Sequence, residues 1–351
     1  MQEKKIFTRM GDGSIVHMTE AEIREDMKDG MEDAVSRGKI SPLTDEEFEH
    51  LYEIITMPGV IVGVEPGKQV VTTSDSGSDK INTKCGIPTD RAINAMLHER
   101  ILGCDSVDIG YSDYNFKTVK GVAKREASVL KHALNRTTMP LFYGAMPNLG
   151  FYTKPDGPVD NWAVLLPEGK IKEAMAAQEE AVELAVKDIL YVAEQMHDVG
   201  ADGINLDTSG AAGDADFLVS LKATEQIKER FPDLHVEIGM AGEFVLGMHG
   251  KLKYDDVRLA GLYPHKQVKL AEKAGASIFG PVVNTNCNKS FPWNLARVCT
   301  FIKACTEVAE IPIHANAGMG VCGVPMCENL PTDAVSRVAK ALIEICKIDG
   351  L

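Results

Sequence analysis

The chain has 351 residues, of which 44% are hydrophobic, 25% charged and 6% aromatic, a composition that excludes the disordered and collagen-like classes. Its formal net charge of -14, from 37 basic against 51 acidic residues, excludes the basic surface that nucleic-acid binding needs. No apolar run is long enough for a transmembrane helix and the N-terminus lacks the apolar core of a secretory signal, so we expect a cytoplasmic protein without a membrane partner.

Residues 1–103 are predicted to form an N-terminal extension. Thr19 and Thr44 are each followed, three residues later, by a glutamate, which is the capping-box pattern that opens a helix. The pattern predicts two short helices, over residues 19–37 and 44–56. Two more elements are expected in the extension: a β-hairpin over 59–72, where apolar residues alternate around glycine and proline, and a helix over 88–100.

From residue 104 onward, short apolar runs alternate with longer helical patterns. The runs expected as strands are 104–111, 139–147, 201–210, 235–242, 276–284 and 311–318. The helical patterns lie near 118–135, 168–198, 215–230, 256–274, 293–309 and 332–346. This alternation predicts an α/β fold with a parallel sheet, and the low charge of the strand cores fits strands that are buried on both faces.

Several of these strands begin in the same way, because a helix ends, a glycine caps it and a small residue leads into the strand. The segments are Val199-Gly200-Ala201-Asp202-Gly203, Ala274-Gly275-Ala276-Ser277 and, with the same Asp-Gly step, Lys347-Ile348-Asp349-Gly350-Leu351. Residues 104–351 therefore predict six βα units and the start of a seventh strand. Eight units close a TIM (β/α)8 barrel, so we expect an incomplete barrel that lacks about 80 residues; the alternative is a complete open sheet.

Ligands of parallel α/β folds bind beyond the carboxyl ends of the strands. The residues at these ends are polar, acidic and aromatic, and they include Asp108, Tyr111, Tyr143, Asn205, Asp207, Glu237, Glu243, Asn284, His314 and Asn316. No lysine or arginine occurs in this set of segments before Lys289. The ring therefore suits a small cationic ligand better than a phosphate.

Glu237 and Glu243 are the predicted catalytic residues. Two carboxylates near one strand end, among Gly, Met and Ala, would be partly desolvated and would acquire pKa values suited to proton transfer; the alternative is a salt bridge to an outer helix. Asp207 is expected either to act on the substrate or to cap the helix that follows it. His314 lies in an apolar strand, where a lone histidine is more often a packed core residue than a base.

Two glycine-rich loops and the cysteines point to no cofactor. The loop over 210–214 follows a strand and could cradle a phosphate, and the loop over 318–325 is expected to be flexible, but neither has the spacing of a nucleotide-binding motif. None of the eight cysteines forms a C-x-x-C pair, so no metal site and no disulfide are predicted.

Long gapless segments resemble the dimethylamine:corrinoid methyltransferases, a family of pyrrolysine-containing methylamine methyltransferases. The segments include RMGDGSIVHMT (9–19), LFYGAMPNLG (141–150), GADGINLDTSGAAGDADF (200–217), GMAGEFVLGMHG (239–250), FGPVVNTNCNKS (279–290) and GMGVCGVPM (318–326). The resemblance implies a TIM barrel that transfers a methyl group from dimethylamine to the Co(I) of a separate corrinoid protein and releases monomethylamine, as in methylamine-dependent methanogenesis.

The resemblance also implies a pyrrolysine, encoded by an in-frame UAG codon, just beyond Leu351. A UAG codon read as a stop would explain the chain end, and the chain as written is then expected to be inactive. Glu237 and Glu243 would manage protons, and the residues expected to bind substrate are Tyr111, Tyr143, Asp207, Asn284 and Asn316. No cofactor is expected to bind directly, because the corrinoid belongs to the partner, which would dock on the strand-end loops, including 148–169.

Two alternatives remain at this point. One is a pyrrolysine-free relative that demethylates a quaternary amine, which needs no covalent activation. The other is a non-catalytic fragment that binds the corrinoid protein. A homo-oligomer is expected in each case.

Overall fold

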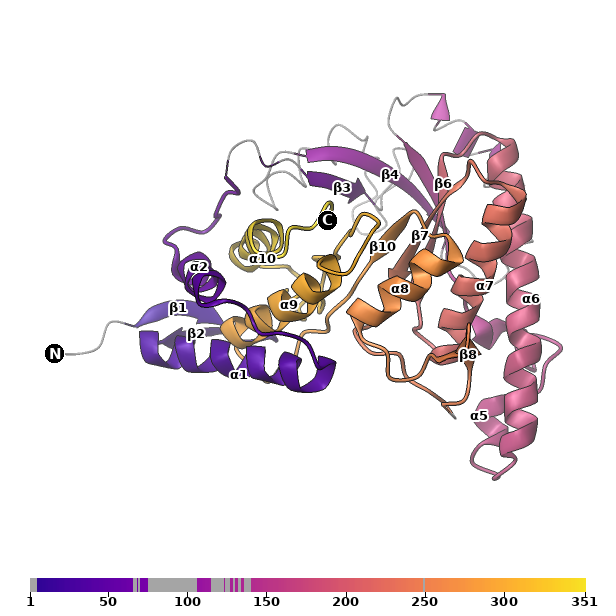
Figure 1. Cartoon of the computed structure of the whole chain (residues 1–351), viewed down its shortest axis with the longest axis horizontal. Coiled ribbons are helices and arrows are strands. Elements are labelled where there is room, and N and C mark those ends of the chain that lie inside the picture. The colour runs from indigo at the N-terminus through magenta and orange to yellow at the C-terminus, as the bar shows by residue number, and fades with distance from the viewer. Residues whose placement is uncertain are drawn as a thin grey trace. The chain divides into compact units, whose positions relative to one another are not determined.

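The computed structural model describes residues 5–65, 140–248 and 250–351, together with residues 68, 70–74, 106–114, 123, 127, 128, 130, 131, 134 and 135 (Figure 1). The chain divides into two compact units. The first unit comprises Met1–Thr73, Ala92–Asp108 and Gly280–Leu351, and the second comprises Ser74–Arg91 and Ile109–Phe279. The predicted boundary at residues 103 and 104 and the predicted helix over 88–100 lie outside the described residues. Among the described helices, none has the length and apolarity to cross a membrane.

The first unit opens with two elements that the capping boxes predict. Helix α1 spans Glu20–Gly38 and helix α2 spans Asp45–Thr56, and in each the threonine side chain accepts a hydrogen bond from the N–H three residues later while the glutamate reaches back. An antiparallel pair, β1 (Ile6–Arg9) and β2 (Ile15–Met18), precedes them. This strand pair was not among the elements predicted from the sequence. The unit also contains two helices from the C-terminal part of the chain, α9 (Phe291–Thr306) and α10 (Thr332–Glu344).

The predicted hairpin over 59–72 is wrong. Its described part contains one strand, β3 (Val70–Ser74), and residues 57–65 form no strand. Side chains of α10 bind backbone carbonyls within this segment and just before it: Arg337 donates to the carbonyls of Met57 and Gly59, and Lys340 donates to that of Gly63. The segment is therefore held by a helix and not by a second strand.

The second unit is built on parallel strands. β4 (Ser106–Tyr114), β5 (Leu141–Ala145), β6 (Gly203–Ser209) and β7 (His235–Met240) pair in parallel in this order, and β10 (Ile278–Gly280) lies next to β7. The helices between them are α6 (Ile171–Asp198), α7 (Asp214–Arg230) and α8 (Pro264–Ala274). Strand–helix alternation around a parallel sheet is the repeating unit of the (β/α)8 barrel, and the predicted α/β class is confirmed.

Two excursions interrupt this alternation in the second unit. After β5 the chain forms a 3-10 turn, η1 (Leu149–Tyr152), and a short helix, α5 (Trp162–Leu165). After β7 it forms a small hairpin, β8 (Lys253–Tyr254) and β9 (Val257–Arg258), where the sequence predicted a helix from 256. Helix α8 starts only at Pro264, since proline suits the first helical position, where no N–H bond is needed.

The similar sequences at the starts of several predicted strands share one structural role: a polar side chain accepts a hydrogen bond from a backbone N–H of the neighbouring strand. The Asp202 carboxylate accepts the N–H of Leu141 at 2.7 Å, and the Asp349 carboxylate accepts the N–H of Ile313 at 2.9 Å. The Ser277 hydroxyl accepts the N–H of Val236 at 3.3 Å. In each case the first polar residue of one strand caps the backbone of the preceding strand, so the repeated junction has a repeated structural purpose.

The predicted sixth strand, 311–318, is present only as a short parallel bridge between His314 and Gly350. The Gly350 N–H donates to the carbonyl of Ile313, and the Ala315 N–H donates to the carbonyl of Gly350. Residues 349–350 therefore pair in parallel with the predicted sixth strand, as the start of a seventh strand would.

We expect the Asp202→Ala substitution to destabilise the second unit by about 1–3 kcal/mol, because it leaves the N–H of the buried residue Leu141 without a partner. Urea denaturation followed by circular dichroism measures the change. Asp233→Ala is the matched control, since the Asp233 side chain is 76% exposed and its ion pair with His197 lies at the surface. Equal effects of the two substitutions would contradict the prediction.

Candidate functional site

A polar row crosses one face of the parallel sheet in the second unit. In the strand register, Asn205 lies directly opposite Gly144 on one side and Glu237 on the other. Directly paired residues of parallel strands project to the same face. Asn205 is 8% exposed and Glu237 is 5% exposed. The row thus combines a buried amide and a buried carboxylate with a glycine that leaves space beside them.

The next position along the strands continues this arrangement. A Cβ placed on Gly239 would lie 3.4 Å from Asp207 Oδ1 and 3.6 Å from Asn205 Oδ1. The two side-chain oxygens therefore converge over a residue that has no side chain. Asn205 Oδ1 is buried and accepts no hydrogen bond from the described residues. The arrangement offers acceptors to a small ligand that donates hydrogen bonds.

A bulge places Asp207. The register of β6 against β7 shifts between Leu206 and Ser209, and Thr208 takes a positive φ of 52°. Asp207 Oδ1 accepts the Thr208 N–H at 2.6 Å. Bulges of this kind redirect side chains at sheet edges and active sites. Asp207 does not cap the next helix, because the N-cap of α7 is Gly213.

On the same face of the sheet, the residues near the amino ends of the strands are apolar. A Cβ on Gly203 would lie 2.6 Å from the ring of Phe142, so the ring fills the space that this glycine leaves. Phe142 and Ile278 belong to one buried hydrophobic cluster, although β6 and β7 lie between their strands. The sheet therefore curves towards the face that carries Asn205 and Glu237, as the interior of a barrel does.

The predicted substrate-binding residue Tyr143 does not join this row. Tyr143 pairs with Ile204 in the register, on the opposite face, and it is fully buried there among residues such as Leu206 and Ile238. Tyr111 lies opposite Phe142 in the β4–β5 ladder. The side chain of Tyr111 lies outside the described residues.

Glu243 lies on the loop after β7, three residues beyond the strand end. Its side chain is half-buried, and its carbonyl accepts the side-chain N–H of Gln267 at 3.2 Å. Glu237, in contrast, lies within the strand. The two predicted catalytic carboxylates thus differ in environment: Glu237 is enclosed, and Glu243 lies on the loop at the carboxyl end.

Asn284 and Asn316 belong to the first unit and are exposed. Asn284 forms a bridge with Val321, and the Cys322 N–H donates to the carbonyl of Val283 at 2.7 Å. The glycine-rich loop over 318–325 is therefore tied by backbone hydrogen bonds to the segment that carries Asn284. Asn316 lies against Gly318, where a Cβ would be 2.9 Å from its Oδ1.

His314 in the first unit is a packed residue, as the sequence analysis expected. It is 6% exposed, and burial lowers its pKa to about 4, against a smaller opposite effect of the Asp349 carboxylate. The imidazole is therefore neutral at physiological pH. Among the described residues no group of three or more His, Cys, Asp or Glu side chains could hold a metal ion.

The glycine-rich loop over 210–213 is occupied by a side chain of its own helix. The N–H of Ala212 donates to the Asp216 carboxylate at 3.3 Å, and the N–H groups of Ala211 and Gly210 also act on it. Burial nevertheless dominates and raises the pKa of Asp216 to about 7. The N–H groups expected to cradle a phosphate are thus directed at an internal carboxylate.

Asp216 is expected to make stability depend on pH. Its pKa in the folded chain lies above the ordinary value of 3.8, so between about pH 4 and 7 the folded chain holds a proton that the unfolded chain has released. The free energy of unfolding therefore falls as pH rises through this window, by up to about 1.4 kcal/mol per pH unit. Asp216→Asn should remove this contribution, which urea unfolding at pH 5 and pH 7 measures; parallel pH profiles of the two proteins would contradict it.

Asn205 is the site residue that the sequence reasoning did not select. It was one of several polar residues at the third strand end, and nothing in that segment distinguished it. The alternation Gly203, Asn205, Asp207 was the available signal, because residues two apart on a strand share a face. Pairing with Glu237 needs the register, which the sequence does not show.

A family model of dimethylamine methyltransferases matches residues 4–351. Among solved structures, the chain is similar to inosine 5'-monophosphate dehydrogenase from Legionella pneumophila, with 12% identity, coverage of 80% of this chain and 56% of that chain, and a TM-score of 0.36. It is also similar to dihydropteroate synthase from Xanthomonas albilineans, with 16% identity, coverage of 81% and 85%, and a TM-score of 0.35. These TM-scores are too low to carry an argument about fold or function.

Proposed function

This chain belongs to the dimethylamine methyltransferase family, and from that premise we propose that it transfers one methyl group from dimethylamine to the Co(I) centre of a separate corrinoid protein. The second product is monomethylamine. The corrinoid is a substrate carried by the partner, and the reaction would serve methylamine-dependent methanogenesis in the cytoplasm.

The observation that carries the proposal is the polar row on the inner face of the sheet. Asn205 Oδ1 is a buried acceptor without a donor among the described residues, and the Glu237 carboxylate lies opposite it in the register. Dimethylammonium has two N–H donors and one positive charge, which match an amide oxygen and a carboxylate. A quaternary amine has no N–H to donate, so Asn205 disfavours that alternative.

The chemistry requires the departing nitrogen to be protonated. In dimethylammonium, the C–N bond breaks with its electron pair going to nitrogen, Co(I) supplies the two electrons of the new C–Co bond, and neutral monomethylamine leaves. We assign to Glu237 the task of keeping that proton on the nitrogen, since a nearby carboxylate favours the charged form of an amine. Asn205 and Asp207 would orient the substrate, and Glu243 on the loop would exchange the proton with solvent.

The pyrrolysine implied by the family resemblance would supply an electrophilic imine that fixes the amine. Residues 349–350 pair in parallel with the strand segment at His314, so a residue following Leu351 would continue a strand towards the carboxyl end, where the family's reactive residue is needed. Within the second unit, Gly144 and Gly239 leave space for a substrate beside the polar row. We propose that methyl transfer requires this residue and that the 351-residue chain alone does not turn over.

The test is a methyl-transfer assay with the pyrrolysine-containing protein, dimethylamine and the reduced corrinoid protein. Loss of the Co(I) absorbance and formation of monomethylamine in equal amounts are expected. The codon that follows Leu351 is expected to be UAG with an open frame behind it. Preferential demethylation of a quaternary amine, or turnover by the 351-residue chain itself, would overturn the proposal.

A further inference from the structure

The bulge in β6 sets the position of the Asp207 carboxylate. The register of β6 against β7 shifts between Leu206 and Ser209. The two residues of β6 between them, Asp207 and Thr208, thus lie opposite Gly239 alone. A bulge leaves its extra residue without a ladder partner, so other contacts must keep its shape. The groups that hold this bulge therefore decide where Asp207 lies.

A buried serine spans the bulge. The Ser209 hydroxyl donates to the carbonyl of Leu206, on the other side of the bulge, at 2.9 Å. In a regular strand Asp207 and Ser209 would share a face, because they are two residues apart. Here Asp207 converges with Asn205 over Gly239, whereas the Ser209 side chain is fully buried and reaches back to its own strand. This hydrogen bond fixes the separation between the two ends of the bulge.

A second serine, Ser220, connects the bulge to helix α7. The Ser209 and Ser220 hydroxyl oxygens are 2.6 Å apart, and both residues are fully buried. Because Ser209 gives its proton to the Leu206 carbonyl, Ser220 is the donor within this serine pair. Loss of the Ser209 hydroxyl would therefore remove two buried hydrogen bonds at once, and buried polar groups that lose their partners are costly.

The loop that follows the bulge has its own attachment to α7. The N–H of Ala211 donates to the carbonyl of Thr208 at 3.1 Å, and the N–H of Ala212 donates to the Asp216 carboxylate at 3.3 Å. Asp216 thus anchors the loop, whereas the serine pair anchors the bulge itself.

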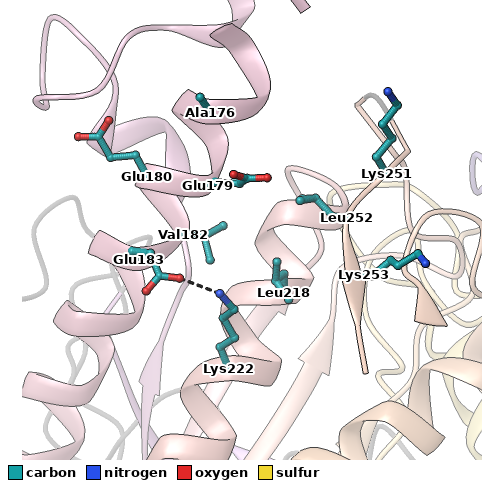
Figure 2. Close-up of a pocket in the computed structure, with 10 residues that line it drawn as sticks. All are labelled: Ala176, Glu179, Glu180, Val182, Glu183, Leu218, Lys222, Lys251, Leu252 and Lys253. Atoms are coloured by element: carbon teal, nitrogen blue, oxygen red, sulfur yellow. Dashed lines mark hydrogen bonds and ion pairs between the residues drawn. The ribbon is translucent and has the colours of Figure 1, made fainter. Parts of the chain in front are cut away.

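Helix α7 is a fixed base for these hydrogen bonds. At its start, the N–H of Asp214 donates to the carbonyl of Leu246 at 2.7 Å, and the Phe217 side chain is fully buried. Further along, Figure 2 shows Lys222 turned towards Glu183 of α6, with which it pairs at 2.7 Å. A helix that is held at several points can restrain the strand end to which it is bonded.

We propose that Ser209 and Ser220 are positioning residues for methyl transfer: their hydroxyl pair stabilises the β6 bulge, and the bulge holds the Asp207 carboxylate beside Asn205. The inference rests on the proposed function, in which Asp207 and Asn205 orient the dimethylammonium substrate. Both serines act through Asp207 and not on the substrate itself. An orienting carboxylate works only where the bulge places it, because small displacements of such a group reduce its effect steeply.

The experiment compares two variants of the pyrrolysine-containing protein, with dimethylamine and the reduced corrinoid partner. Ser209→Ala is expected to raise KM for dimethylamine about tenfold and to lower kcat less than about threefold, since misplacing an orienting group by about 1 Å costs up to about 100-fold. Thr224→Val is the matched control. Thr224 carries another fully buried hydroxyl of α7, which donates to the Ser220 carbonyl at 2.7 Å, and its loss should leave KM unchanged.

Two further variants test whether the serine pair acts through Asp207. Ser220→Ala should raise KM less than Ser209→Ala does, because Ser209 keeps its bond to the Leu206 carbonyl; it also carries the test if Ser209→Ala does not fold. Asp207→Asn keeps an acceptor for the Thr208 N–H and removes the charge. Adding Ser209→Ala to that variant should change KM little further, since residues that act through one group are not additive.

Amide hydrogen exchange, followed by mass spectrometry, examines the bulge without turnover. Exchange over residues 206–213 should be faster in Ser209→Ala than in Thr224→Val. Unchanged exchange in Ser209→Ala overturns the proposal, and so does a full tenfold rise in KM when Ser209→Ala is added to Asp207→Asn. An active protein whose KM does not respond to Ser209→Ala overturns the positioning role alone. Absence of dimethylamine turnover in the unaltered protein overturns the proposed function and the positioning role with it.

Discussion

Replacing Glu237 by glutamine is expected to lower the rate of methyl transfer from dimethylamine by about 10²- to 10⁴-fold, the range typical for loss of a group that controls a proton in the transition state. Glutamine keeps the size of the side chain and removes its charge. Because Glu237 is only 5% exposed, water cannot easily take over the role. The measurement is kcat for the pyrrolysine-containing protein with its reduced corrinoid partner, across a range of pH.

Two further variants make this result specific. Glu229→Gln changes an exposed glutamate at the end of α7 and should leave kcat unchanged. Asn205→Leu removes the buried acceptor and should raise KM for dimethylamine more than it lowers kcat, since it acts mainly on substrate orientation. If Glu237→Gln retains nearly full activity with an unchanged circular dichroism spectrum, the proton is controlled elsewhere, and Glu243 becomes the first candidate.

Gly30→Ala is expected to destabilise the first unit by about 2–3 kcal/mol. In an isolated helix this change would be favourable by about 1 kcal/mol. Here α1 packs against α9, and a Cβ on Gly30 would lie 2.1 Å from the carbonyl oxygen of Trp293. That oxygen belongs to the backbone of a buried helix and cannot move aside, so the helices must separate, and overpacking of this kind typically costs about 1–3 kcal/mol.

Tryptophan fluorescence during urea unfolding is a suitable measurement, because Trp293 lies at the contact itself. Asp29→Ala is the control, since Asp29 is the exposed neighbour of Gly30 on the same helix and its replacement should change stability by less than about 0.5 kcal/mol. A Gly30→Ala protein as stable as the original would mean that α1 and α9 do not approach each other this closely.

The sequence predicted correctly those helices and strands whose defining pattern lies within a few neighbouring residues. Both capping boxes and the helices behind them were confirmed, because the threonine and the glutamate that form each box are close in sequence. The strand cores of the second unit were also confirmed to within a few residues, since most residues of strands that are buried on both faces are apolar. The predicted hairpin over 59–72 was wrong, because backbone carbonyls of this segment are bound by the side chains of Arg337 and Lys340, which lie 278 and 277 positions further along the chain.

For the candidate site too, one part could be predicted from the sequence and another part depends on the tertiary structure. A polar, acidic set of strand ends could be derived from the order of strands and helices, and Glu237 and Asp207 were selected on that basis. The register decided which of these residues share a face: it pairs Asn205 with Glu237 and puts Tyr143 on the other side of the sheet. A shift of one residue reverses the face of every side chain on a strand, and residue type alone cannot show that shift.

The amino-acid order by itself therefore determined the α/β class, the family and the repeated strand junction, because periodicity, caps and long matching segments are properties of the chain. Only the tertiary structure decided that Asp202, Ser277 and Asp349 each cap a neighbouring strand, that Asp216 fills the glycine-rich loop, and that an acceptor on Asn205 is buried without a donor. These facts depend on which distant backbone or solvent reaches each polar atom, and that is settled when the strands come together.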